Sequence, residues 1–557
     1  MHRLLRPLLL IALAAVTAQA DPSPAAGPVP ALRAPDGALP DDAALEAAGA
    51  RIGTITIRNG PIFDLGDPRQ NHALFRLANR LHLRTRAGAV RAQLLFHSGE
   101  RYQARLLAET ERNLRQVSFL REPRVRPVAW HDGVVDILVE THDVWTLQLG
   151  PSYGRSGGKS NTSVEFEDDN LLGYGKTLLT GHSRNVDRTA TYLEWQDPTV
   201  LGSHWVDDLR WADNSDGHLY GLQLYRPFYA LDVRQTAGVL ATDSTEADTR
   251  YLLGAAYDQY RHAARSLNAF GGWSSGLVAG HALRFTVGWQ EQRDRFSPLY
   301  LGTPPVNAAL APIPANRDLA YPYLQLDWLT DRFRTTHNQD LIGRTEDLQF
   351  GLNATLQTGL AAPVFGADRH ALVYTGQVAY GWALSSRQQL YATSAVAGRI
   401  EQGRAVDLST SAAASWYWRT SRHTLSYARV SGDAGHRLDL DHYYSLGGDT
   451  GLRGYPLRYQ LGSALAQIRI EERGYTDYSI WQLFNVGGAL FFDAGRTFGA
   501  NPIGDPQLGW LRDVGLGLRL GNNRSSLGRV IHVDFATPLN GRNLSRVQFL
   551  VSTEATF

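Results

Sequence analysis

The sequence predicts a mostly β protein: a transmembrane antiparallel β-barrel preceded by one small α+β domain. Three observations predict this fold class: an export signal at the N-terminus, a composition rich in glycine and aromatic residues, and a long succession of segments in which polar and apolar residues alternate. The 557 residues include 54 glycines, 24 tyrosines and 13 tryptophans, and the mean hydropathy is negative. This combination is typical of outer-membrane barrels.

The N-terminus, "MHRLLRPLLLIALAAVTAQA", has the three parts of a cleavable secretory signal. Arg3 and Arg6 precede an apolar run over 8–16, and small residues precede a predicted cleavage site after Ala20. The run is shorter than the roughly 20 residues that a spanning helix needs, and an uncleaved anchor is the alternative. The chain has no cysteine, which excludes disulfides, thiolate metal sites and a lipid-bearing cysteine. We therefore expect an exported protein with residues 1–20 removed.

Residues 21–50 are rich in Pro, Ala and Asp without an apolar period, which predicts a flexible linker. Residues 51–143 read as a strand, two helices and two strands, the last two joined by a turn at Asp132-Gly133. This is the size of one small domain. It holds 15 arginines against 10 acidic residues, and either a solvated surface or a binding face accounts for that excess.

Residues 144–557 form a series of period-2 segments separated by Gly, Asn, Asp and Pro. In "VIHVDFA", Ile531, Val533 and Phe535 alternate with His532 and Asp534. Such a pattern fits a soluble sandwich or a barrel with an apolar outside and a wet lumen. The export signal and the aromatic content favour the barrel. We mark about fifteen candidate strands before the glycine-rich stretch "LGGDTGLRGYP" at 446–456 and five after it.

The strand "GGALFFDAG" places a carboxylate inside this barrel. Leu490 and Phe492 share one face, and Asp493 lies on the other. Because the two apolar side chains suit lipid, we expect Asp493 to face the lumen. Glu471, on the polar face of the strand after the glycine-rich stretch, is a second inward acceptor for a cation.

Four pieces of the chain resemble the outer-membrane assembly-factor superfamily, the BamA- and TamA-like bacterial surface antigens, with two-partner secretion transporters as relatives. They are the order of elements over 51–143, which resembles one POTRA domain, "DDNLLGYGK" at 168–176, "LRGY" at 452–455 and "FFDAG" at 491–495. The resemblance spans 51–557. It implies a barrel of 16 strands or more in the outer membrane of a Gram-negative cell, with the POTRA-like domain in the periplasm.

The resemblance also implies a site. The glycine-rich loop would dip into the lumen, where Arg453 would pair with Asp493, and a guanidinium can hold carboxylates bidentately. The alternative is an Arg453 on a solvated loop, paired with nothing. The remaining residues of the prediction are Gly451 and Gly454 for close approach of the backbone, Tyr455 for packing, Glu471 as second acceptor, Gly495 of the strand motif, and Phe549 and Phe557 as the signal of the C-terminal strand.

No enzyme motif is present in a convincing form. The loop "GRSGGKS" at 154–160 is one residue short of a phosphate loop and lies between strands. The sequence has neither a Gly-x-Ser-x-Gly elbow nor a His-Glu-x-x-His zinc motif. His and Asp residues lack metal-ligand spacing. We therefore expect no enzyme activity, no metal and no cofactor.

Two classes of function remain. By resemblance, the chain assists insertion or translocation of polypeptides, adding client strands at the seam between "VWTLQLGPSY" and "RVQFLVSTEATF" and receiving extended clients at the POTRA-like domain. The alternatives are a passive pore or lipid or small-solute conduit, and a two-partner-secretion-type transporter. Expected partners are outer-membrane lipid and unfolded clients, with accessory periplasmic proteins unknown. The balance of 55 basic and 54 acidic residues gives no reason to expect nucleic acid.

Overall fold

The computed structural model describes residues 39–299, 312–500, 507–526 and 530–554. The predicted signal peptide at 1–20, most of the predicted linker and Phe557 lie outside these ranges. The described chain divides into two compact units. One comprises the residues up to Arg58 with Phe96–Ala108 and Arg124–Glu140, and the other comprises Asn59–Leu95, Glu109–Pro123 and the chain from Thr141 onward.

A three-stranded sheet of order β1-β3-β2 forms the N-terminal α+β region. Its elements are α2 (Asp42–Ala47), β1 (Arg51–Gly60), α3 (Ala73–Leu81), α4 (Ala87–Arg91), α5 (Ala104–Gln116), β2 (Leu120–His131) and β3 (Val134–Asp143). Alternating apolar residues on these strands, such as Ile52, Ile137 and Val139, are fully or almost fully buried. Three helices, rather than the two expected, connect β1 to β2.

Helix α2 corrects the predicted linker, which was expected to reach residue 50. The side chain of Asp41 accepts a hydrogen bond from the N–H of Ala44 at 2.8 Å, as an N-cap does. Leu45 is completely buried. A cap and one buried leucine order this short segment, although its Pro- and Asp-rich surroundings indicate a flexible chain.

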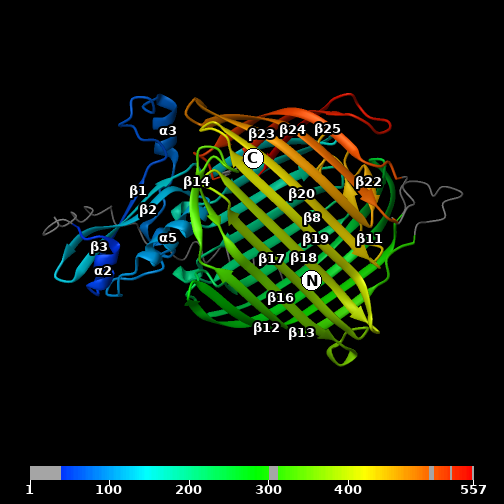
Figure 1. The fold of residues 1–557 in the computed structure, drawn as a ribbon, viewed down its shortest axis with the longest axis horizontal. Helices are drawn as coiled ribbons and strands as arrows, with labels where there is room; N and C mark the ends of the chain where they lie inside the picture. The colour runs from blue at the N-terminus through cyan, green and yellow to red at the C-terminus, as the bar shows by residue number, and fades with distance from the viewer. Residues whose placement is uncertain (1–38, 300–311, 501–506, 527–529, 555–557) are drawn as a thin grey trace. The chain divides into compact units, whose positions relative to one another are not determined.

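Twenty antiparallel strands close into a barrel (Figure 1). They are β4 (Leu147–Ser156), β5 (Lys159–Asp168), β6 (Thr177–Arg184), β7 (Thr189–Asp197), β8 (Val206–Asn214), β9 (Gly217–Arg226), β10 (Gln235–Leu252), β11 (Ala255–Val278), β12 (His281–Leu299), β13 (Arg317–Thr330), β16 (Gly351–Ala361), β17 (Ala371–Ala383), β18 (Gln388–Glu401), β19 (Arg404–Arg419), β20 (Thr424–His436), β23 (Ala464–Ile480), β24 (Phe484–Phe498), β25 (Leu511–Asn522), β26 (Val530–Pro538) and β27 (Gln548–Glu554).

The barrel therefore has 20 strands rather than 16, the smallest number that the resemblance implies. Fifteen barrel strands precede the glycine-rich loop and five follow it, in agreement with the segments marked in the sequence. Residues 248–260 form the turn end of the hairpin of β10 and β11, and the two strands pair up to Leu252 and Ala255. Each alternating segment needs a hydrogen-bonded neighbour on both sides, and a 20-strand closure supplies one to all of them.

The outer surface of the barrel carries apolar side chains in register. Leu490, Leu516, Phe535 and Phe549 lie directly opposite one another on β24 to β27, and all four are exposed. Their neighbours along each strand, such as Asp493 and Asp534, are buried inside. The alternation thus places apolar groups outside and charged groups inside. Among the described residues, no helix is long and apolar enough to cross a bilayer.

Two insertions interrupt the series of barrel strands. Between β13 and β16, β14 (Phe333–His337) and β15 (Thr345–Gln349) form a two-stranded sheet. Between β20 and β23, β21 (Tyr444–Leu446) and β22 (Gln460–Gly462) form another, and they flank the glycine-rich stretch. We call residues 437–463 the lumen loop.

Candidate functional site

The lumen loop folds around a small apolar core of its own. Leu446, Leu452, Tyr455 and Tyr459 are completely buried and pack together with residues of β23 and β25. The N–H of Leu452 donates to the carbonyl of Gly447 at 3.0 Å, which closes the turn before Arg453. The core and the turn hold the loop in one conformation inside the barrel, so Arg453 is presented from a fixed position.

Gly451 is required by its surroundings. Its φ of +113° lies in the region that favours glycine, and a Cβ there would come within 2.5 Å of the Gln467 side chain. Gln467 in turn donates to the carbonyl of Thr450 at 2.5 Å. The backbone of the loop therefore lies directly against β23.

Arg453 meets both carboxylates that the sequence placed on the inner face. Its Nε and Nη2 donate to the two oxygens of Asp493 at 2.7 and 3.0 Å, and Nη2 lies 2.9 Å from an oxygen of Glu471. The guanidinium also stacks over the ring of Phe491, 3.4 Å from its centroid. All of these groups are buried or nearly so, so the bidentate pair is shielded from water.

Charged groups of both signs surround Arg453. Beyond Arg453 itself, Arg469 lies 3.1 Å from Asp493, Arg473 lies 2.9 Å from Glu471, and Arg519 bonds Asp534. With Asp513, this inner wall holds four guanidinium groups and four carboxylates, namely Arg453, Arg469, Arg473 and Arg519 with Glu471, Asp493, Asp513 and Asp534. Buried charges without such ion-pair partners would cost several kcal/mol each.

Gly454 and Tyr455 tie the next residues of the loop to β25 and β26. The N–H of Gly454 donates to Asp513 at 3.1 Å, and a Cβ at Gly454 would come within 2.6 Å of the Cβ of Asp513. The hydroxyl of Tyr455 donates to the carbonyl of Asn540 at 2.7 Å and accepts from the N–H of Arg512 at 2.9 Å. Arg453 thus contacts β23 and β24, whereas Gly454 and Tyr455 both contact β25, and Tyr455 also contacts Asn540 beyond β26.

The other predicted residues lie apart from this cluster or against its edge. Gly495 on β24 faces the loop, where an added Cβ would meet Leu446 at 3.0 Å. Phe549 points outward and packs on Phe535 with ring centroids 5.1 Å apart. Phe557 lies outside the described residues. In the turn 168–176, the N–H of Gly175 donates to the Asn170 side chain at 2.7 Å.

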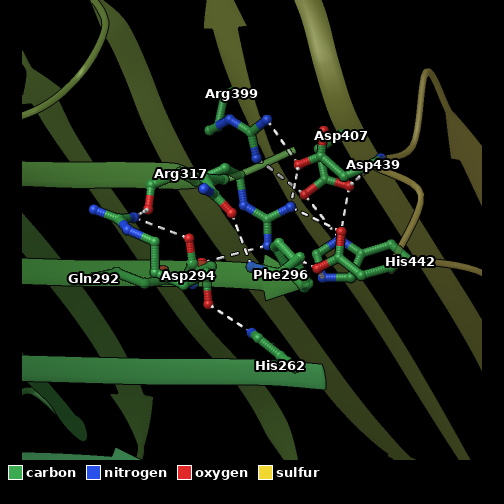
Figure 2. A network of polar contacts seen from close by, with 12 residues as sticks. His262, Gln292, Asp294, Phe296, Arg317, Arg399, Asp407, Asp439 and His442 are labelled. Atoms are coloured by element: carbon green, nitrogen blue, oxygen red, sulfur yellow. Dashed lines mark hydrogen bonds and ion pairs between the residues drawn. The ribbon is translucent and has the colours of Figure 1, made fainter. Parts of the chain in front are cut away.

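A second set of ion pairs holds the lumen loop, and it was not predicted from the sequence. Arg317 on β13 donates to Asp439 at 3.0 Å and to both oxygens of Asp441 at 2.8 and 2.7 Å, while Arg399 on β18 donates to Asp439 at 2.9 Å (Figure 2). Asp294 on β12 accepts from Arg317 at 3.3 Å. The alternating carboxylates of "DLDH" at 439–442 could have indicated these ion pairs. Their arginine partners could not be identified from local pattern, because they lie up to 124 residues away in the chain.

Asp439 of this network lies close to Asp407 of β19 and to His442, and the three side chains have metal-ligand geometry. The ligand atoms of Asp407, Asp439 and His442 lie within 4.8 Å of one another. Arg399 already donates to Asp407 at 3.1 Å and to Asp439 at 2.9 Å, so its guanidinium supplies the positive charge that a metal would bring. In Figure 2 the carboxylates and His442 gather around the two arginines, as expected of an ion-pair network.

The seam between the first and last strands is thinly paired. Among the described residues, β27 and β4 share one register pair, Val551 with Arg155, whereas β26 and β27 share seven. Each missing pair removes backbone hydrogen bonds that elsewhere hold adjacent strands together. Among the strand junctions of the barrel, and counting described residues alone, this one has the fewest register pairs.

The lumen loop contacts the chain on both sides of the seam. On the β4 side, the hydroxyl of Ser156 donates to the carbonyl of Gly448 at 2.7 Å, and Gly157 packs tightly on Leu457. On the β27 side, the hydroxyl of Tyr459 donates to the carbonyl of Arg542 at 2.6 Å and accepts from its N–H at 2.7 Å. The loop thus contacts the segments on both sides of this junction.

Comparison with known proteins adds little to this geometry. No protein-family model matches the chain, and no curated protein matches it. Solved structures do match, among them BamA from Haemophilus ducreyi lacking POTRA domains 1–3, with TM-score 0.39 and 14% identity over 91% of this chain and 85% of that one. CdiB from Acinetobacter baumannii gives 0.44 and 10% over 90% and 74%, and CdiB from Escherichia coli gives 0.46 and 13% over 91% and 76%.

These structures include a member of the family that the sequence motifs resemble. At TM-scores below 0.5 and at most 14% identity, however, the similarity carries no argument about what this chain does. Its function must therefore be inferred from the residues of the barrel and of the lumen loop.

Proposed function

We propose that this chain is an outer-membrane protein that assists insertion or translocation of polypeptides, and that client strands add at the seam between β4 and β27. The exposed apolar rows on the barrel support a membrane setting, because such side chains suit lipid and would be costly in water. The resemblance supports the outer membrane of a Gram-negative cell and a periplasmic N-terminal domain. The proposal includes no catalytic activity.

The main support for strand addition is the small number of register pairs between β4 and β27 among the described residues. A client strand can add to a barrel only where existing pairing is given up. Among the described residues a single register pair joins β27 to β4, so little pairing would have to be given up there. The lumen loop would control the exchange, since it bridges the flanks of the seam through Ser156 and Tyr459. Arg453 would hold the loop in its bridging position through Asp493.

A disulfide across the seam tests this function. The chain has no native cysteine, so Arg155→Cys with Val551→Cys introduces one defined pair. Directly opposed antiparallel residues have Cα atoms about 4.5–5.5 Å apart, within the range that a disulfide accepts. The matched control is Leu516→Cys with Phe535→Cys, another outward pair on the fully paired strands β25 and β26.

Each protein is reconstituted in liposomes, and folding of a urea-denatured small barrel is followed by its heat-modifiable gel mobility. We expect the wild type and the oxidised control to accelerate folding over empty liposomes. The oxidised seam pair should lose the acceleration and regain it after reduction. An oxidised seam pair that remains fully active would contradict strand addition at this seam. Absence of acceleration by the wild type, with ion leakage through the same liposomes, would instead favour a passive conduit.

A further inference from the structure

Helix α3 exposes an apolar face. Leu74, Leu77 and Leu81 lie at i, i+3 and i+7 and are 65, 50 and 63% exposed. Leu83, just beyond the helix, is 57% exposed. An amphipathic helix normally turns this side toward a core, so four large apolar side chains together on one short segment require a partner or an apolar environment.

The orientation of α3 is fixed by its opposite side. Phe75 is buried and stacks on Phe63 with ring centroids 3.9 Å apart. The side chain of Asn79 accepts from the N–H of Phe63 at 3.1 Å and donates to its carbonyl at 2.8 Å. Because Phe75 and Asn79 hold this side, the helix cannot rotate to bury its leucines.

The same contacts attach α3 to one end of the barrel. Phe75 packs in a cluster with Trp145, which precedes β4, and with Leu483 in the turn between β23 and β24. Two residues of this hairpin, Tyr478 and Trp481, are 66 and 79% exposed. Exposed Tyr and Trp at the end of a membrane barrel are typical of the level of the lipid headgroups. The leucines of α3 belong to the unit that contains this rim.

The segment around α3 is strongly basic. Residues 71–91 contain five arginines and no acidic residue. Arg80 lies on the helix and is exposed, and the exposed Arg84 follows the helix directly. Arg76 lies on the side away from the leucines, where its guanidinium donates to the side chain of Asn71 at 2.7 Å. An apolar leucine face flanked by arginines is the pattern of a helix that lies in the surface of an anionic membrane, where the cations contact phosphates.

We propose that α3 is a lipid-binding element: its face of Leu74, Leu77 and Leu81 enters the surface of an anionic phospholipid bilayer at the barrel end where β4 begins, and Arg80 and Arg84 contact the lipid phosphates. The inference rests on the barrel lying in a membrane and not on any activity toward clients. It would fix the rim beside the first strand of the seam against the bilayer.

The test uses the full chain with one cysteine that carries an environment-sensitive fluorophore. Leu74→Cys places the label on the apolar face. The matched control, Arg76→Cys, lies two residues on and about 200° around the same helix. Both proteins are reconstituted in vesicles of phosphatidylcholine with phosphatidylglycerol, and in phosphatidylcholine alone, with brominated acyl chains as quenchers. Heat-modifiable mobility shows that each variant is folded.

We expect the label at position 74 to be quenched at least about twice as strongly as the label at position 76, because the apolar face of an interfacial helix lies below the headgroups. This quenching should weaken in vesicles without the anionic lipid. A label at 74 that stays unquenched in both vesicles would overturn the proposal. Equal quenching in neutral and anionic vesicles would overturn the assignment to anionic lipid. A disulfide between two copies of the unlabelled Leu74→Cys protein, formed on oxidation, would assign the face to self-association instead.

This result is independent of client folding. A protein that fails to accelerate the folding of a denatured barrel still reports whether α3 lies in lipid, and a protein whose α3 stays in water can still act at the seam.

Discussion

Removing the guanidinium of Arg453 should loosen the lumen loop by a predictable amount. In Arg453→Ala, Asp493 loses two hydrogen bonds of 2.7 and 3.0 Å, and Glu471 loses an ion pair of 2.9 Å. Breaking a buried ion pair costs about 3–5 kcal/mol, because the remaining charge stays buried without compensation. Arg469 and Arg473 still contact the two carboxylates, so we expect a cost near the lower limit, about 3 kcal/mol.

This cost converts to a shift in thermal stability. With an unfolding entropy of about 2.1 cal/mol/K per residue, a barrel of roughly 400 residues loses about 3–4 °C for 3 kcal/mol. The midpoint is measured in detergent from the change in gel mobility on heating. Arg453→Lys should fall between wild type and Arg453→Ala, because an ammonium keeps the charge but cannot donate bidentately.

Arg404→Ala is the matched control, since it removes an exposed arginine of β19 with the same change of charge. It should melt as the wild type does. If Arg453→Ala melted no lower than Arg404→Ala and folded client barrels at the same rate as wild type, the loop would not depend on the contact with Asp493, and the role assigned to Arg453 would be wrong.

Two further predictions concern the loop and the β14–β15 insertion. Gly454→Ala should destabilise the barrel by about 1–3 kcal/mol, because its Cβ would come within 2.6 Å of Asp513, whereas Gly271→Ala, with no atom within 4 Å of its Cβ, should not; equal midpoints for the two variants would contradict this. Burial raises the pKa of Glu346 on β15 to about 7. Since the unfolded pKa is lower, the folded state binds the extra proton, and this residue's contribution to stability falls as the pH rises from about 4.5 to 7. The thermal midpoint of Glu346→Gln relative to that of wild type should therefore be higher at pH 8 than at pH 5. A difference in midpoint that does not change with pH would refute the assignment.

Much of the fold follows from local pattern. Period-2 alternation is a property of neighbouring residues, so "GGALFFDAG" alone was enough to predict an inward Asp493 and an outward Leu490, and the structure places them so. The count of strand-like segments before and after the glycine-rich stretch also agrees with the 20 strands, whereas the resemblance implies only a minimum of 16. The exposed leucines of α3 show the opposite case. Their helical spacing predicts an apolar face, but not whether a core covers it.

The sequence by itself determined which residues alternate, where the chain must turn, and that a single arginine lies on a glycine-rich loop near inward carboxylates. The tertiary structure decided how β4 and β27 meet, because the pair that joins them among the described residues, Val551 with Arg155, brings together residues almost 400 positions apart in the chain. It also decided that Arg317 and Arg399 hold Asp439. Local pattern specifies the face on which a side chain lies, but only closure of the barrel brings side chains from distant strands within hydrogen-bonding distance.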